Sequence, residues 1–190
     1  MKDFCGIMNI YAGLDLLNRD EKMRVLIRKF GWPDFDPKQD YFQSLLRSIV
    51  FQQLSGKSAN TIYERFINLI PKTVTLSPKE VLKLDKDEMR KTGLSFQKIN
   101  YLRNLAYFFE NNSFQKKDVE RMTDEEISNA LTQIKGIGQW TVDMFLMFTL
   151  NRADILPYTD LGVQKGIKII LNMKTSLTQV LMEHWCYVSS

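Results

Sequence analysis

The sequence has 190 residues, of which 44% are hydrophobic and 25% are charged, and its net charge is +4 with a pI of about 9.0. This length and composition are typical of a folded chain with its own core, arranged as one domain or as two small lobes, and no apolar run is long enough to cross a bilayer. The two cysteines and the single histidine exclude a disulfide framework, a four-cysteine iron–sulfur cluster, a zinc site and a histidine-based triad.

The first forty residues predict a helical segment and a linker. An amphipathic stretch covers residues 21–30, and a proline-containing stretch follows at 32–37. The first residues lack the apolar run of a secretory signal, which predicts a cytoplasmic protein.

From residue 41 onward nearly every segment predicts a helix, and no alternating pattern is long enough to build a sheet. The first apolar stripe has helical spacing and comprises Phe42, Leu45, Leu46, Ile49 and Val50. This helix is expected to end near residue 55, and the next to run from about 58 to 71. Capping residues indicate further helix starts at Ser77, Asp85, Ser95 and Thr123. The pattern predicts an all-α, two-lobed helical bundle with residues 41–130 as one lobe.

A glycine hairpin separates the last of these helices from an almost wholly apolar one, and its sequence at 135–141 is Lys-Gly-Ile-Gly-Gln-Trp-Thr. At a tight hairpin, Gly136 and Gly138 allow backbone angles and a close approach that a side chain would prevent. The backbone N–H groups that begin the next helix, around Gln139 and Thr141, then point outward beside the positive end of its dipole. This arrangement predicts a phosphate site, which the basic charge also favours; an ordinary interhelical turn is the alternative.

A carboxylate follows at Asp160, in the segment Leu-Pro-Tyr-Thr-Asp-Leu-Gly at 156–162. Asp160 is expected to begin a helix whose buried side comprises Leu161, Val163, Ile167 and Ile170. An N-cap role accounts for most aspartates in such places. Here it is compatible with chemistry, because the helix dipole favours the ionised carboxylate.

Residues 41–171 resemble the helix-hairpin-helix DNA glycosylases of the 3-methyladenine DNA glycosylase II group. The resemblance is carried by residues 42–59, 93–103, 135–141 and 156–162. It implies that residues 131–190 hold the helix-hairpin-helix motif and a catalytic Asp160, which pack with residues 1–40 and face an interlobe groove. It also implies a monomeric base-excision-repair enzyme that flips alkylated purines such as 3-methyladenine out of double-stranded DNA and removes them hydrolytically, leaving an abasic site.

The resemblance also assigns roles to individual residues. The base pocket would contain Trp140, with Tyr158 and Phe51 as further candidates and Met144 where the group often has another aromatic residue. The residue that fills the space left by the flipped nucleotide would be Gln53, with Leu54 as the alternate; a buried or capping amide is the other interpretation of Gln53. Phosphates would be contacted by the hairpin residues Gly136, Gly138, Gln139 and Thr141 and by Lys57 and Lys98, although exposed lysines are usually only solvated.

No cofactor is expected for the reaction itself. The resemblance implies that the carbonyls of Thr132, Ile134 and Ile137 bind a structural potassium or sodium ion. Relatives that also cut the DNA strand have a lysine at the position of Trp140, so this sequence predicts a monofunctional glycosylase.

The sequence departs from the group at both ends. It ends at 183–190 with Glu-His-Trp-Cys-Tyr-Val-Ser-Ser in place of a Pro-Tyr-Arg segment and a closing tryptophan-rich helix, and the N-terminal β domain of longer members is missing. We therefore expect a pocket that lacks one wall and weaker activity. The shortened end makes a non-catalytic helix-hairpin-helix DNA-binding module the first alternative. A glycosylase for deaminated or mismatched bases is a separate alternative.

Overall fold

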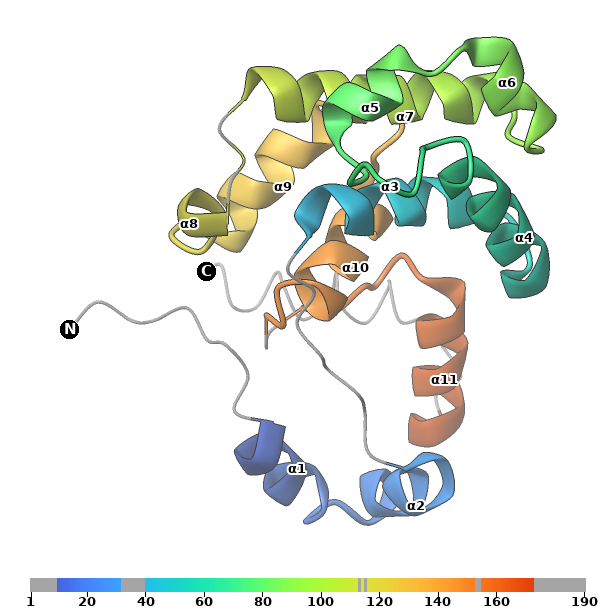
Figure 1. Cartoon of the computed structure of the whole chain (residues 1–190). Coiled ribbons are helices and arrows are strands. Elements are labelled where there is room, and N and C mark those ends of the chain that lie inside the picture. The colour runs from blue at the N-terminus through green and yellow to red at the C-terminus, as the bar shows by residue number, and fades with distance from the viewer. Residues whose placement is uncertain (1–9, 32–39, 113, 115, 153–154, 173–190) are drawn as a thin grey trace. The chain divides into compact units, whose positions relative to one another are not determined.

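The computed structural model describes residues 10–31, 40–112, 114, 116–152 and 155–172, and every regular element in these ranges is a helix (Figure 1). This confirms the predicted all-α fold class. The helices are α1 (Ile10–Leu17), α2 (Glu21–Phe30), α3 (Tyr41–Phe51), α4 (Gly56–Ile67), α5 (Pro78–Lys83), α6 (Lys86–Lys91), α7 (Phe96–Asn111), α8 (Lys116–Val119), α9 (Asp124–Thr132), α10 (Gln139–Phe148) and α11 (Leu161–Leu171).

The chain forms two compact units. The larger comprises residues 36–150 and holds α3 to α10, and the smaller comprises residues 1–35 together with 151–190 and holds α1, α2 and α11. The hairpin between α9 and α10 therefore belongs to the larger unit, whereas Asp160 belongs to the smaller one.

Helix α3 forms the centre of the larger unit, where it contacts α4, α7 and α10, while α5 and α6 pack on α7 (Figure 1). The whole predicted stripe of α3, from Phe42 to Val50, is buried. Four residues of α7 are buried at helical spacing, namely Ile99, Leu102, Leu105 and Ala106. Both stripes belong to the core of the larger unit, where α3 packs against α7 and α10.

The predicted helix starts are confirmed by side-chain caps. Ser77, Asp85 and Ser95 each accept hydrogen bonds from backbone N–H groups in the first turn of the following helix. Thr123 and Glu126 form a complete capping box at the start of α9. Because each cap satisfies N–H groups that have no intrahelical partner, these helix boundaries follow from short-range chemistry.

Several boundaries and faces differ from the predictions. Helix α3 ends at Phe51 rather than near residue 55, and α4 begins at Gly56 rather than at about 58. The helix α10 is apolar on nearly all sides in sequence, yet only one side of it is buried, because Trp140 and Phe148 are 39% and 45% exposed. The predicted linker at 32–37 lies outside the described residues.

In the smaller unit, α2 has the bounds predicted for the amphipathic stretch, and Asp20 caps it. Helix α1 had no predicted counterpart. Helix α11 begins directly after Asp160, as predicted, but none of the four residues of its predicted buried side is buried: Leu161 is 68% exposed, and Val163, Ile167 and Ile170 are partly exposed. Leu161 and Val163 are two positions apart and therefore lie about 200° apart around the helix, so Leu161 cannot share the face of Val163 and Ile167. Within the described residues, none of the helices has the length and apolarity that crossing a membrane would require.

Candidate nucleic-acid interface and catalytic aspartate

The hairpin between α9 and α10 depends on a glycine at position 136. Gly136 has a φ of +110°, and a Cβ atom built on it would lie 2.2 Å from Cγ of Tyr101 on α7. Only glycine fits both the conformation and the space. Gly138 differs from the prediction, because its φ of −103° suits any residue and a Cβ atom there would meet nothing within 4 Å. The openness in front of Gly138 leaves the backbone accessible to a ligand.

Two backbone amides at the start of α10 are unpaired within the part of the chain that the structure describes. Gly138 is the N-cap and provides no side-chain cap, and among the described residues the N–H groups of Gly138 and Gln139 donate no hydrogen bond. The N–H of Thr141 is already used, because it donates to the carbonyl of Gly138 at 2.9 Å. Two unsatisfied donors at the positive end of a helix dipole suit an anion such as a phosphate group.

Gln52 on the turn after α3 supports the hairpin. Its Nε2 atom donates to the carbonyl oxygen of Gly136 at 3.0 Å and to Oγ1 of Thr141 at 3.3 Å. Thr141 is only 2% exposed, so we expect its hydroxyl to hold the hairpin rather than to reach a ligand. The sequence prediction did not include Gln52, because its partners lie more than eighty positions along the chain.

The side chain of Gln139 links α9 to α10. Its Oε1 accepts from Oγ of Ser128 at 2.9 Å, and its Nε2 donates to Oδ1 of Asp143 at 2.8 Å. Burial raises the pKa of the Asp143 carboxyl above its ordinary value, and the hydrogen bond from Gln139 opposes this rise. With its side chain engaged, Gln139 can contact a phosphate through its backbone N–H alone.

The turn after α3 presents Gln53 in a strained conformation. Gln53 has a φ of +56°, is exposed, and is followed by Leu54, which is 39% exposed. A non-glycine residue in the left-handed region costs on the order of 1 kcal/mol. Strain of this kind is found at ligand-binding sites, and the exposed side chain is compatible with the predicted insertion into DNA.

Lys98 at the start of α7 is held by the protein itself. Its Nζ atom donates to the carbonyl oxygens of Val50 and Gln52, both at 2.7 Å, so it satisfies the C-terminal end of α3. Partial burial lowers the pKa of Lys98 below its ordinary value. From the sequence, this ammonium group was predicted to contact phosphates or solvent only, so its bonds to the protein are a new finding. Lys57, the other lysine predicted to contact phosphates, is exposed at the start of α4.

The hairpin and the turn after α3 border one hollow of about 410 Å³. Its lining includes four of the residues predicted to contact DNA, namely Gln53, Lys98, Gly136 and Gly138. Gln52 and Tyr101 also line it. The structure thus brings residues from three separate segments of the sequence to one polar surface within the larger unit, which is the candidate DNA interface.

Three of the predicted base-pocket residues belong to the larger unit. Trp140 is exposed enough to contact a ligand, and Met144, one turn further along α10, is partly buried. The ring of Phe51 is stacked under the guanidinium of Arg47 at 4.5 Å and contacts Tyr63 edge-on at 6.2 Å. These contacts make Phe51 part of the packing between α3 and α4.

Asp160 and Tyr158 lie in the smaller unit. Asp160 caps α11, and its Oδ1 accepts from the N–H of Val163 at 2.8 Å. A Cβ atom built on Gly162 would lie 3.0 Å from the same oxygen, so the absence of a side chain there leaves room for the carboxylate. Tyr158 is 46% exposed. The N-cap position confirms the local prediction that Asp160 begins a helix.

The carbonyl oxygens predicted to bind a cation fit that role in part. Those of Thr132 and Ile137 accept no hydrogen bond from the described residues, whereas that of Ile134 accepts from the N–H of Ile137 at 2.9 Å. Unpaired carbonyl oxygens are suitable ligands for an alkali cation. No cluster of three or more histidine, cysteine or acidic side chains that could hold a metal occurs among the described residues.

Lys98 and Lys57 form a matched pair for testing whether Lys98 stabilises the fold, because Lys98 is bonded to two carbonyls and Lys57 is exposed. Replacing Lys98 by methionine is expected to lower the free energy of unfolding by about 1–3 kcal/mol, because two carbonyls lose a charged donor. Replacing Lys57 by methionine is expected to change it by less than about 0.5 kcal/mol, because Lys57 is exposed. Urea unfolding of both variants measures the difference, and equal stabilities would contradict the structural role of Lys98.

Two helices joined by a glycine hairpin with uncapped amides define a helix-hairpin-helix protein. The sequence profile of the HhH-GPD superfamily base excision DNA repair proteins matches residues 46–186, and the chain belongs to this family. It is 34% identical to DNA-3-methyladenine glycosylase 1 of Schizosaccharomyces pombe over 84% of this chain and 72% of that protein.

Two solved structures are similar over most of the chain. One is the 3-methyladenine DNA glycosylase of Schizosaccharomyces pombe in complex with abasic DNA, with a TM-score of 0.78, 32% identity, and coverage of 92% of this chain and 87% of that one. The other is the DNA-3-methyladenine glycosidase of Bacillus halodurans, with a TM-score of 0.76, 33% identity, and coverage of 90% and 79%. These likenesses agree with the helix-hairpin-helix architecture of α9 and α10.

Proposed function

We propose that this chain is a monofunctional DNA glycosylase that flips alkylated purines such as 3-methyladenine out of duplex DNA and hydrolyses their N-glycosidic bond. The observation that carries the proposal is the hairpin, whose Gly138 and Gln139 present amides without a protein acceptor among the described residues. It occurs in a chain that is 34% identical to a DNA-3-methyladenine glycosylase.

In this proposal the hairpin binds a phosphate of the lesion-containing strand. The N–H groups of Gly138 and Gln139 donate to phosphate oxygens, and the dipole of α10 favours the negative charge. These contacts are independent of sequence, so they fix the position of the DNA without selecting a base. Gln53 fills the space that the flipped nucleotide leaves in the duplex.

Trp140 supplies an electron-rich face for the flipped base. An alkylated purine such as 3-methyladenine carries a positive charge, and a cation over an indole is stabilised by about 0.5–2 kcal/mol. Damage also lowers the energy needed to unstack the base. We assign Met144, one turn further along α10, to the same pocket, where its thioether adds an adaptable contact beside the indole face.

The reaction breaks the bond between C1′ of the deoxyribose and the purine nitrogen, and both electrons leave with the base. Because the alkylated base is cationic, it departs as a neutral molecule and positive charge develops on the sugar. Asp160 stabilises this charge and orients the attacking water. The water oxygen forms the new bond to C1′, and its proton is released.

The residue at position 140 favours hydrolysis without strand cleavage. Cleavage through a Schiff base needs an amine at the reacting sugar carbon, and the indole of Trp140 provides none. The carbonyls of Thr132, Ile134 and Ile137 would hold a potassium or sodium ion beside the phosphate, where its charge would stabilise the bound DNA. The reaction itself requires no cofactor.

The proposal is tested with methylated duplex DNA. We expect chromatography to detect free 3-methyladenine, and the DNA strand to break at the resulting abasic site only after alkali treatment. Duplex binding without release of any base would favour the non-catalytic module. Strand breakage without alkali, together with a borohydride-trapped adduct, would contradict a monofunctional reaction. Release of only deaminated or mismatched bases would show that alkylated purines are not the substrate.

Replacing Gln53 by glycine is expected to separate stability from function. Glycine relieves the left-handed strain, so the free energy of unfolding should rise by up to about 1 kcal/mol. Excision from duplex DNA should fall, because the space left by the flipped nucleotide is no longer filled, whereas excision from a single strand should change little. Urea unfolding and paired excision assays measure the two effects, and unchanged duplex activity would remove Gln53 from the insertion role.

A further inference from the structure

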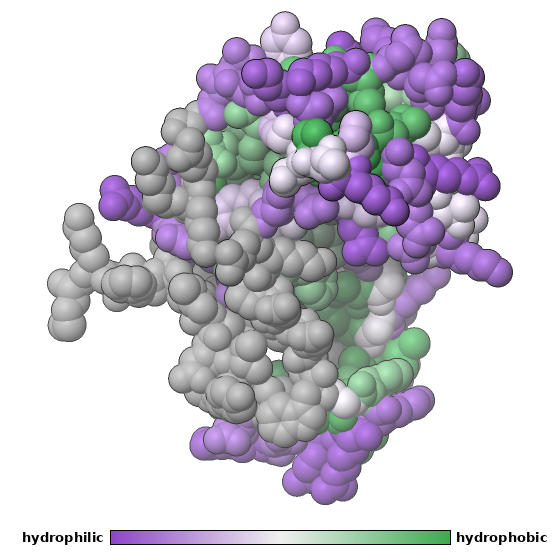
Figure 2. Space-filling view, viewed as in Figure 1, coloured by the Kyte–Doolittle hydropathy of each residue, from purple (hydrophilic) through white to green (hydrophobic). Residues whose placement is uncertain are grey.

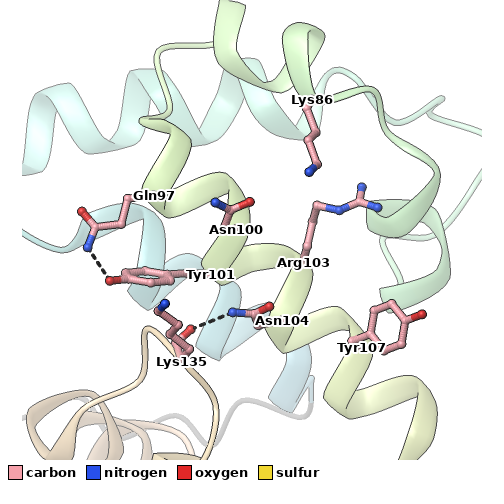
Figure 3. A pocket seen from close by; sticks show the side chains of 8 residues that line it. All are labelled: Lys86, Gln97, Asn100, Tyr101, Arg103, Asn104, Tyr107 and Lys135. Atoms are coloured by element: carbon pink, nitrogen blue, oxygen red, sulfur yellow. Dashed lines mark hydrogen bonds between the residues drawn. The ribbon is translucent and has the colours of Figure 1, made fainter.

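We propose that a groove along α7 binds the phosphodiester backbone of DNA flanking the lesion, as a continuation of the hairpin site. This inference rests on the proposed function only in taking duplex DNA as the partner. The groove is a hollow of about 730 Å³, formed by α7 together with Lys86 at the start of α6 and Lys135 in the hairpin (Figure 3). We call it the α7 groove.

The α7 groove is cationic and has no acidic lining. Lys86 and Lys135 extend toward the same hollow from opposite sides, and Arg103 on α7 also lines it (Figure 3). Arg103 donates to the carbonyls of Leu82 and Leu84, which fixes its position while its charge remains. No aspartate or glutamate is among the residues that line the hollow. A polyanion is therefore the ligand that its electrostatics favour.

The floor of the groove adds neutral hydrogen-bond donors. Asn100 and Asn104 lie one turn apart on α7, and Asn104 is fixed by a hydrogen bond from its Nδ2 to the carbonyl of Lys135 at 3.3 Å. Tyr107 lies a further turn along the rim and is exposed. Lysine, amide and phenol groups are those that contact phosphates and sugars in protein–DNA interfaces. Single exposed lysines are usually only solvated, but two that line one hollow together with two amide side chains make a more specific arrangement.

The groove is continuous with the candidate DNA interface. Tyr101 and Gln97 line both the α7 groove and the hollow beside the hairpin. At its far end a third hollow, of about 610 Å³, shares Asn104, Tyr107 and Lys135 with it. From residue 97 to residue 107, α7 rises about 15 Å, which matches the axial rise of about four nucleotides of one strand. Hydrophilic residues cover the edge of the larger unit where α6 and α7 lie (Figure 2).

The test measures duplex binding separately from excision. Lys86→Gln, Lys135→Gln and the double variant are titrated with a duplex that contains a stable abasic-site analogue, at several salt concentrations. Each single substitution is expected to weaken binding several-fold and to reduce the slope of log K against log[salt] by about 0.9, and the double variant by about twice that. Lys79→Gln is the matched control, because Lys79 is exposed on α5 and does not line the groove; its slope should not change.

A second experiment varies the length of the duplex on either side of the lesion. Shortening the duplex on the side that occupies the groove should abolish the effect of both lysine substitutions, whereas shortening the other side should not. If the salt slopes of the lysine variants are unchanged while Gly138→Ala still weakens duplex binding, the α7 groove does not bind DNA, and the proposed function is unaffected. If the lysine variants have reduced salt slopes but the wild-type protein releases no base, DNA binding by the α7 groove is supported and the glycosylase activity is contradicted. If the wild-type protein does not bind duplex DNA, both proposals are wrong.

Discussion

Replacing Gly136 by alanine is expected to destabilise the larger unit by about 3 kcal/mol or more. The left-handed φ of +110° is unfavourable for any residue with a Cβ atom, which costs about 1–3 kcal/mol. The new methyl group would also overlap Cγ of Tyr101, 2.2 Å away, and forcing α7 aside adds a comparable penalty. Urea unfolding measures the loss, and a decrease below about 1 kcal/mol would contradict the close packing of the hairpin on α7.

Gly138→Ala is the matched control, because it is expected to change stability little and duplex affinity substantially. A methyl group at position 138 meets no atom within 4 Å and the backbone conformation is unrestricted, so stability should fall by no more than about 1 kcal/mol, the loss of a good N-cap residue. The methyl group would stand before the amides of Gly138 and Gln139. We expect duplex affinity to drop about tenfold, which corresponds to about 1.4 kcal/mol. Wild-type affinity in this variant would show that the phosphate is bound elsewhere.

The comparison of these two glycines shows what the sequence could predict. A Gly-x-Gly pattern between helices indicates a tight turn and exposed amides, and both features are present. It does not distinguish the glycine that packing requires from the one that leaves access open, because the distinction depends on Tyr101, which is distant in the sequence. Helix starts were predictable for the opposite reason, since Ser77, Asp85, Ser95 and Thr123 act on N–H groups two or three residues away.

The contacts that support the candidate interface were also not predictable from local sequence patterns. Lys98 binds the carbonyls at the end of α3, and Gln52 binds the hairpin, in both cases across more than forty positions of the chain. Neither contact follows from the spacing of neighbouring residues, so the sequence indicated only phosphate or solvent for Lys98 and did not select Gln52. The strain at Gln53 was also not predictable, because glutamine is not a residue that favours positive φ.

Replacing Asp160 by asparagine is expected to abolish excision while duplex binding is retained. Asparagine is as good an N-cap as aspartate, so the hydrogen bond to the N–H of Val163 can persist and α11 should keep its stability within about 0.5 kcal/mol. The negative charge that stabilises the sugar cation is lost, which should lower the rate of base release about 10²- to 10⁴-fold. Single-turnover excision and binding to an abasic-site duplex measure the two properties, and normal turnover would remove Asp160 from the catalytic role.

Two glycines of α11 provide the control for this assignment. A methyl group on Gly162 would press on Oδ1 of Asp160 at 3.0 Å, whereas one on Gly166 meets nothing within 4 Å. Either substitution should raise helix propensity by about 1 kcal/mol, so stability does not separate them. Gly162→Ala is expected to lower the rate of base release with little change in duplex affinity, because the carboxylate must move, whereas Gly166→Ala should excise at the wild-type rate. Equal excision rates in the two variants would mean that the reaction does not depend on the position of the Asp160 carboxylate.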